Sequence, residues 1–247
     1  MGNLANAVTI VTGASSGIGA ATAKRLAASG ARVVLAARNE DKLKALVSEI
    51  TDAGGMATFR VTDVTDPDDM NALVGLAEET YGPVDILVNN AGLMLFSKWE
   101  DTAVGDWDRM IDTNLRGYLH AIAAVLPSMM ERKSGRILNM SSVAGIHVGE
   151  GAGVYGATKF FIRGITESLR QEVGVGSGIQ VSMVSPGVID TGWADKVSDA
   201  EGRKAAQALN EGAIPPETVA EAVAYALDQP ANVTVNDVVI HPTGQRW

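Results

Sequence analysis

The sequence predicts an α/β fold in which a doubly wound, parallel sheet of seven strands carries helices on both faces. Short apolar, β-branched runs alternate with longer helix-like segments along the whole chain, and a glycine-rich loop separates the first run from the first helix. A chain of 247 residues with 46% hydrophobic content can bury one substantial core. We therefore expect residues 1–247 to form a single domain.

The elements follow one another without repeats or linkers. Expected strands are the apolar runs at residues 7–12, 32–37, 56–61, 86–88, 136–140, 179–184 and 235–240. Helix-like segments follow, first up to Gly30 and then at residues 39–52, 67–81, 106–130, 155–173 and 216–229. Asn39 can cap the second helix, and Asp66-Pro67 starts the third. The polar, Gly-containing residues 192–214, with Trp193 as their large apolar group, are expected to form a lid over a site.

Composition narrows the function. The chain has no cysteine and three histidines, so a thiol nucleophile is excluded and no metal centre is expected. A net charge of −9 disfavours nucleic acid and anionic membranes as partners. The sequence has no run of 18 apolar residues and its N-terminus leaves no room for a signal peptide, so a cytoplasmic location is expected.

The glycine-rich loop at residues 13–19 points to a dinucleotide. Gly13, Gly17 and Gly19 lie between a strand and an Ala-rich helix, where a tight turn lets backbone N–H groups approach a pyrophosphate. A second signal follows the second strand, where an NAD-binding unit would place an acid but Ala37 and Arg38 stand instead. Arg38 can pair with a 2′-phosphate, which favours NADP(H). The alternatives are that Arg38 only solvates a strand end, or that Glu40 or Asp41 binds an NAD ribose.

Residues 141–159 carry the candidate chemistry. Tyr155 and Lys159 are spaced so that both project from one face of a helix's first turns, and a cation beside a phenol lowers the phenol's pKa. A tuned phenol suits proton transfer to a carbonyl or from an alcohol. Ser142 follows a strand and can hold the substrate oxygen. Taken alone, Tyr-x-x-x-Lys is usually a surface pair.

Together, the 12–19 loop, Asn89-Asn90-Ala91-Gly92, Asn114, Ser142, Tyr155-x-x-x-Lys159 and Pro186-Gly187 resemble the short-chain dehydrogenase/reductase family over essentially the whole chain. The resemblance implies that Tyr155 is the catalytic acid or base, that Ser142 orients the substrate oxygen and that Asn114 holds a water in a proton relay. Lys159 would lower the Tyr155 pKa and bind the nicotinamide ribose. The same resemblance implies the strand order 3-2-1-4-5-6-7 and tetramers built from the helices near 106–130 and 155–173, with dimers left open.

The cofactor-binding residues implied by these motifs and by the resemblance are Gly13, Ser15, Ser16, Gly17, Ile18, Gly19, Arg38, Asp63, Val64, Asn90, Ala91, Gly92, Tyr155, Lys159, Pro186, Gly187, Ile189 and Thr191. The chain also resembles the NADP-dependent branch that contains serine (3-hydroxy acid) dehydrogenases and clavaldehyde reductases. Members of that branch often carry Arg where this chain has Ile146.

The expected activity is reduction of a ketone or aldehyde by NADPH, reversible as alcohol oxidation. A 3-hydroxy acid or 3-oxoacyl reductase is a second interpretation, and a non-catalytic NADP-binding protein is a third. The expected substrate pocket offers no evident cation, so neutral, bulky substrates are favoured over acids. Its candidate residues are Met94, His147, Val188 and Trp193, although a loop histidine such as His147 is more often simply solvated.

Overall fold

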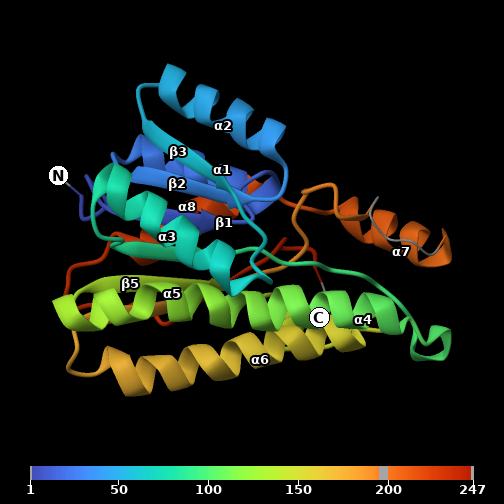
Figure 1. The fold of residues 1–247 in the computed structure, drawn as a ribbon. Helices are drawn as coiled ribbons and strands as arrows, with labels where there is room; N and C mark the ends of the chain where they lie inside the picture. Colours follow the sequence, from blue (N-terminus) through green and yellow to red (C-terminus); the bar gives the residue numbers. More distant parts are fainter. Residues whose placement is uncertain (1, 195–199, 246–247) are drawn as a thin grey trace.

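A computed structural model describes residues 2–194 and 200–245 and contains one seven-stranded sheet (Figure 1). Each pair of neighbouring strands is parallel and the order is β3-β2-β1-β4-β5-β6-β7, which confirms the predicted topology. The strands are β1 (Val8–Thr12), β2 (Arg32–Ala37), β3 (Met56–Val61), β4 (Ile86–Asn89), β5 (Gly135–Met140), β6 (Ile179–Pro186) and β7 (Asp237–Ile240).

Helices cover both faces of the sheet (Figure 1). One apolar cluster joins the sheet to α1 (Gly17–Ala28), α2 (Glu40–Asp52) and α8 (Pro216–Leu227). A second cluster joins the opposite face to α3 (Pro67–Tyr81), α5 (Gly117–Arg132) and α6 (Gly153–Leu169). Because both faces are covered, β1, β4 and β6 are buried along their whole length, including polar residues such as Gln180 and Ser182 of β6.

The predicted helix starts are confirmed. The Asn39 side chain accepts a hydrogen bond from the Lys42 N–H at 3.0 Å, and the Asp66 side chain accepts one from the Asp68 N–H at 2.9 Å. Each bond satisfies an N–H group that has no partner within the helix.

The expected helix at 106–130 is interrupted. It divides into α4 (Val104–Ile111), a π-helical turn (Asp112–Arg116) and α5. The turn contains Asn114, which is fully buried and whose amide bonds both backbone groups of Leu93, at 2.8 Å each. The Asn114 amide therefore ties this π-helical turn to the loop after β4.

The predicted lid contains a helix, α7 (Ala200–Asn210), which stands apart from the sheet at the right of Figure 1. Residues 195–199 of the lid lie outside the described part of the chain. Ala206 of α7 and Ala194 form a small apolar cluster with Phe96 and Trp193. Ala194 and Ala206 are thus tied to Phe96, in the loop after β4, through aromatic side chains.

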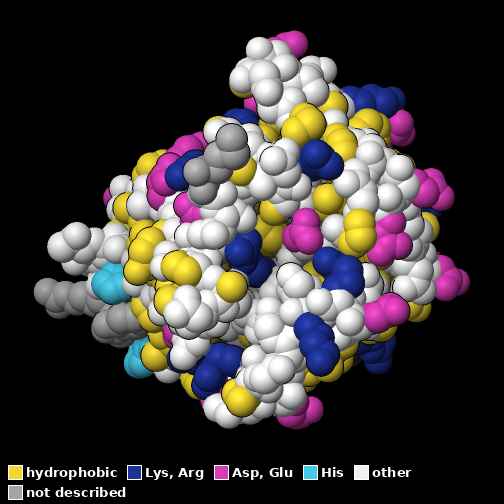
Figure 2. All heavy atoms as spheres, turned by 90° about the vertical axis from the view of Figure 1, so that its left-hand side faces the viewer, with side chains coloured by type: hydrophobic (Ala, Val, Ile, Leu, Met, Phe, Trp, Pro, Cys, Tyr) yellow, Lys and Arg dark blue, Asp and Glu magenta, His cyan; other side chains and the backbone are white. Residues whose placement is uncertain are grey.

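No helix within residues 2–194 and 200–245 is long and apolar enough to cross a membrane. Figure 2 shows the face on the left of Figure 1, where the N-terminus lies. Acidic and basic side chains are interspersed over that face, so its charges do not form a patch of one sign.

Candidate functional site

A cavity of about 520 Å³ lies at the carboxyl ends of the strands and is lined by residues that follow β1 to β6. This edge is where open α/β sheets take their ligands. Every residue expected to bind the cofactor lines this one cavity: Gly13, Ser15, Ser16, Gly17, Ile18, Gly19, Arg38, Asp63, Val64, Asn90, Ala91, Gly92, Tyr155, Lys159, Pro186, Gly187, Ile189 and Thr191. The structure therefore brings together residues that are far apart in the sequence.

The glycine-rich loop is held close to the loop after β4. Gly13 has a φ of 66°, and a Cβ there would lie 2.8 Å from the Cα of Ala91. A Cβ at Gly19 would lie 2.3 Å from the carbonyl oxygen of Gly13. Asn90 fastens the two loops, because its side-chain amide donates to the Thr12 carbonyl at 2.9 Å. Only glycine fits this cradle at residues 13 and 19, as a loop that wraps closely around a pyrophosphate requires.

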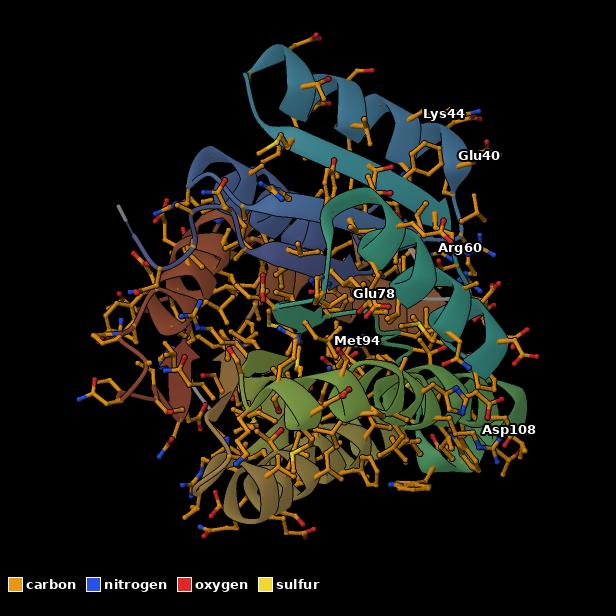
Figure 3. All side chains as sticks on the ribbon, turned by 60° about the vertical axis from the view of Figure 1, so that its left-hand side comes forward. Glu40, Lys44, Arg60, Glu78, Met94 and Asp108 are labelled. Carbon is orange, nitrogen blue, oxygen red and sulfur yellow. The ribbon has the colours of Figure 1, made fainter. Side chains whose placement is uncertain are left out.

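Arg38 lines the far end of the cavity beside Asp63. Burial would raise the pKa of Asp63, but hydrogen bonds from the N–H and hydroxyl of Thr65, together with Arg38, hold that pKa below its usual value. Glu40, one of the two acids that could serve NAD, forms an ion pair with Lys44 at 2.8 Å, and both lie on α2 in Figure 3. The cation at this end is thus Arg38, and Glu40 is already paired.

Tyr155, Lys159 and Ser142 meet at the other end. Tyr155 lies in the first turn of α6 and Lys159 one turn later, as their spacing predicts. The Lys159 Nζ lies 5.7 Å from the centroid of the Tyr155 ring and donates to the Met140 carbonyl at 2.9 Å. The Ser142 hydroxyl donates to the Pro186 carbonyl at 3.3 Å and also forms a hydrogen bond with the side chain of Tyr155. A phenol, a hydroxyl and a buried ammonium therefore converge on one wall.

The pKa values correct one expectation. Burial raises the pKa of Tyr155 to about 12, against a hydrogen bond with Ser142 that lowers it. Burial also lowers the pKa of Lys159 to about 8. The predicted lowering of the Tyr155 pKa by Lys159 is therefore not seen in this structure, because desolvation of the phenolate outweighs a cation that is itself desolvated and bonded to Met140.

Asn114 does not line the cavity. Its amide also donates to the Thr158 hydroxyl at 3.1 Å, in addition to its two bonds to Leu93. Through Leu93 it positions the loop that continues to Met94 and Phe96.

Three of the four expected substrate residues line the cavity: Met94, Val188 and Trp193. Figure 3 shows Met94 between the sheet and the layer of α4, α5 and α6. His147 does not line the cavity and is exposed, because the short 3₁₀ turn Val143–Gly145 carries the chain outward after Ser142. That assignment is therefore corrected. Phe96 and Trp193 also line the cavity and form an aromatic pair with centroids 5.5 Å apart.

Several residues that line the cavity were not predicted from the sequence. They are Asn39, Thr62, Thr113, Met140, Ser141, Val143 and Ala144. Met140 shows why, because it acts through its backbone carbonyl, which accepts from Lys159. A backbone contact leaves no side-chain signal, whereas Asn39 and Thr62, each directly after a recognised strand or cofactor residue, could have been found from position.

Comparisons with known proteins agree with this geometry. The family model described as short chain dehydrogenase matches residues 7–202. An uncharacterized oxidoreductase of Staphylococcus saprophyticus is 42% identical over 246 residues, covering 99% of each chain. The closed form of a serine dehydrogenase complexed with NADP⁺ has a TM-score of 0.89 at 32% identity, covering 97% of this chain and 96% of that one. Actinorhodin polyketide ketoreductase with NADPH has a TM-score of 0.85 at 36% identity, covering 98% of each chain. The chain is therefore an oxidoreductase that belongs to the short-chain dehydrogenase/reductase family.

Proposed function

We propose that this protein transfers hydride between NADP(H) and a neutral ketone or aldehyde, running in reverse as an alcohol dehydrogenase. The observation that carries the proposal is the convergence of Tyr155, Ser142 and Lys159 on one wall of a cavity whose far end holds the glycine-rich loop and Arg38. Such a cavity has room for a dinucleotide and, beside its reactive end, a small substrate.

The residues present fit NADP(H). The loop at residues 13–19 would hold the pyrophosphate against the start of α1, and Arg38 would pair with the 2′-phosphate. Lys159 would contact the nicotinamide ribose. When bound, the cofactor supplies or accepts the hydride. Two of the similar structures contain NADP⁺ or NADPH, which supports this choice.

The protein's own groups handle the proton. In reduction, Ser142 and Tyr155 hold the carbonyl oxygen, and the Tyr155 hydroxyl gives its proton to that oxygen as negative charge develops there. The phenolate that remains is stabilised by the Lys159 ammonium. Asn114 lies in the π-helical turn between α4 and α5 and would hold a water for proton return.

The substrate is proposed to be neutral and bulky. Among the residues that line the cavity, the charged side chains are Arg38, Asp63 and Lys159, and none belongs to the wall formed by Met94, Phe96 and Trp193. A carboxylate buried against that wall would lose its hydration without gaining a cationic partner, which costs on the order of several kcal/mol. An aryl or extended ketone would instead pack on the aromatic pair.

A 3-hydroxy acid dehydrogenase is the second candidate, because a serine dehydrogenase has a similar structure. Against it stands Ile146, which is apolar and exposed at the place where a carboxylate-binding arginine was considered. The remote alternative is an NADP-binding protein without activity, which a turnover assay excludes directly.

The lid and the assembly belong to the same proposal. Residues 192–214, with α7, would cover the substrate, since Ala206 packs with Phe96 and Trp193. Leu119, Met130 and Phe160 expose apolar surface on α5 and α6, which supports a homotetramer formed through these helices. Light scattering after size-exclusion chromatography would give the mass, and a monomer would rule the tetramer out.

Initial rates test the function. Native protein is assayed with NADPH and with NADH against a panel of neutral aryl ketones, aldehydes and 3-oxo acids. The proposal expects NADPH and the neutral ketones to give the higher kcat/KM. A preference for 3-oxo acids would favour the second candidate, and no turnover with any of them would favour the third.

A further inference from the structure

Tyr118 is a buried tyrosine that the proposed reaction does not use. It lies in the first turn of α5 and is 1% exposed, packed with Ile162 and Met183. Its hydroxyl donates to the carbonyl oxygen of Met140 at 2.8 Å. Burial strongly raises the pKa of this phenol, so the hydroxyl stays protonated and remains a donor.

The Met140 oxygen has a second donor. Lys159 donates to the same atom at 2.9 Å, and its Nζ lies 5.5 Å from the centroid of the Tyr118 ring and 5.7 Å from that of Tyr155. The ammonium therefore lies beside two aromatic rings and shares its acceptor, the Met140 carbonyl oxygen, with a phenol. Rings of this kind attract a cation, whereas the hydroxyl competes with it for the carbonyl.

We infer that Tyr118 is a positioning residue for Lys159: its ring borders the ammonium, and its hydroxyl takes part of the Met140 carbonyl's accepting capacity. The hydrogen bond from the ammonium to the Met140 carbonyl is thereby weakened, so Lys159 can also interact with Tyr155 and the cofactor ribose. This inference rests on the proposed function for its catalytic consequence, but its structural part does not.

Other charges do not compete for this role among the described residues. The elements packed against α6 are β5, β6, α4, α5, the π-helical turns Asp112–Arg116 and Arg170–Gly174, and the 3₁₀ turn Val143–Gly145. Of these, β6 and the 3₁₀ turn carry no ionisable side chain. Burial is the one cause that shifts the pKa of Lys159, with no charged neighbour contributing. Ion pairs, hydrogen bonds or solvent take up the charged groups on these elements and on α6 itself: Asp106, Asp108, Arg109, Asp112, Arg116, His120, Glu131, Arg132, Arg136, Arg163, Glu167, Arg170 and Glu172. Figure 3 shows one of them, Asp108, at the outer end of α4.

The direction of the effect follows from the shared acceptor. Each donor withdraws electron density from the Met140 oxygen, so removing the Tyr118 hydroxyl strengthens the bond from Lys159 and favours its charged form. Tyr118→Phe should therefore raise the pKa of Lys159 by about half a unit or more, as loss of one competing neutral hydrogen bond implies.

The first experiment reads Lys159 without turnover. Protein labelled with ¹³C at the lysine ε-carbons is titrated by NMR, and the Lys159 resonance is identified by its absence in Lys159→Met. Native protein, Tyr118→Phe and the control Tyr225→Phe are compared. Tyr225 is 60% exposed on α8, so the control substitution removes the same hydroxyl group far from the site. The expected result is an upward shift in Tyr118→Phe alone. An unchanged or lower pKa in Tyr118→Phe would overturn the inference.

The second experiment reads the reaction. The alkaline limb of kcat/KM for ketone reduction should move to higher pH in Tyr118→Phe, because Lys159 keeps its proton longer. A shifted NMR titration with an unshifted limb would refute the catalytic consequence. If native protein reduced no ketone while the titration shifted, the proposed function would fail and the positioning role would stand.

A third variant guards against misfolding. 3-Fluorotyrosine placed at residue 118 keeps the shape of the side chain but is a stronger donor, so it should lower the pKa of Lys159. A shift in the same direction as Tyr118→Phe would contradict competition for the carbonyl.

Discussion

The ammonium of Lys159 lies 5.7 Å from the centre of the Tyr155 ring, yet its hydrogen bond goes to the backbone of Met140. The two side chains are neighbours on one helix face; Lys159 is buried and Tyr155 is partly buried. Burial raises the pKa of Tyr155 to about 12 and lowers that of Lys159 to about 8. Burial therefore destabilises the charged form of both side chains, the phenolate and the ammonium. In the proposed reaction, the Lys159 ammonium would therefore act on Tyr155 when negative charge develops on the phenol oxygen.

Lys159→Met tests that cooperation. In the proposed alcohol oxidation Tyr155 accepts a proton. Its phenolate should be harder to form when the ammonium is gone, so the pKa of Tyr155 should move further up. The pH at which oxidation becomes efficient should rise, and kcat should fall by about tenfold or more at neutral pH. Lys42→Met removes an exposed lysine on α2 and should leave the profile unchanged. An unchanged pH profile and an unchanged rate in Lys159→Met would contradict the proposal that Lys159 assists Tyr155.

A double substitution at the end of β2 tests the cofactor. Ala37→Asp with Arg38→Leu supplies an acceptor for a ribose hydroxyl and removes the partner of a phosphate, so preference should move from NADPH to NADH. The readout is the ratio of kcat/KM for the two cofactors with one ketone. Native protein that already prefers NADH would contradict the role given to Arg38.

Two glycine substitutions compare the glycine-rich loop with a helix position that has room for a side chain. At Gly19 a Cβ would meet the Gly13 carbonyl oxygen at 2.3 Å, so Gly19→Ala must shift the loop and should weaken NADPH binding about tenfold or more. At Gly75, inside α3, a Cβ meets nothing within 4 Å. Gly75→Ala should keep NADPH affinity and stabilise the fold by about 0.5–1 kcal/mol. Calorimetric titration with NADPH and thermal unfolding measure both, and equal affinities in the two variants would argue against the cradle.

The aromatic wall sets the substrate prediction. Trp193→Ala removes half of the pair with Phe96 and should lower kcat/KM for an aryl ketone more than for a small aliphatic ketone, because only the aryl group packs on the ring. Trp99→Ala is the matched control, since Trp99 is 67% exposed and contacts Trp107. On native protein, the aryl ketone should also be turned over faster than its carboxylate-bearing analogue. Faster turnover of the acid would mean that a cation reaches the pocket.

The sequence predicted the sheet well because its information is local. Apolar β-branched runs, the Asn39 cap and the Asp66-Pro67 start lie within a few residues of the structure they specify. The family resemblance then supplied the strand order, which local patterns do not contain. The resemblance also named the residues that line the cavity, since motifs at the ends of parallel strands meet at one edge.

What the sequence did not predict depends on contacts between distant segments. The break at Asp112–Arg116 arises because Asn114 bonds the backbone of Leu93, and the acceptor of Lys159 is a carbonyl on another strand. His147 was placed in the pocket by its position between Ser142 and Tyr155, but the direction of the turn at Val143–Gly145 decides its exposure. The raised pKa of Tyr155 likewise reflects how much of its surroundings is protein, which spacing along a helix does not reveal.

The most direct test of the central claim is turnover by Tyr155→Phe. The substitution keeps the ring and removes only the hydroxyl whose proton the proposed reaction uses, so NADPH should bind with its native affinity in a fluorescence titration. NADPH oxidation with a neutral aryl ketone should fall by a factor of about 10² to 10⁴. Turnover comparable to that of the native protein, with NADPH bound equally well, would contradict the assignment of Tyr155 as the proton donor.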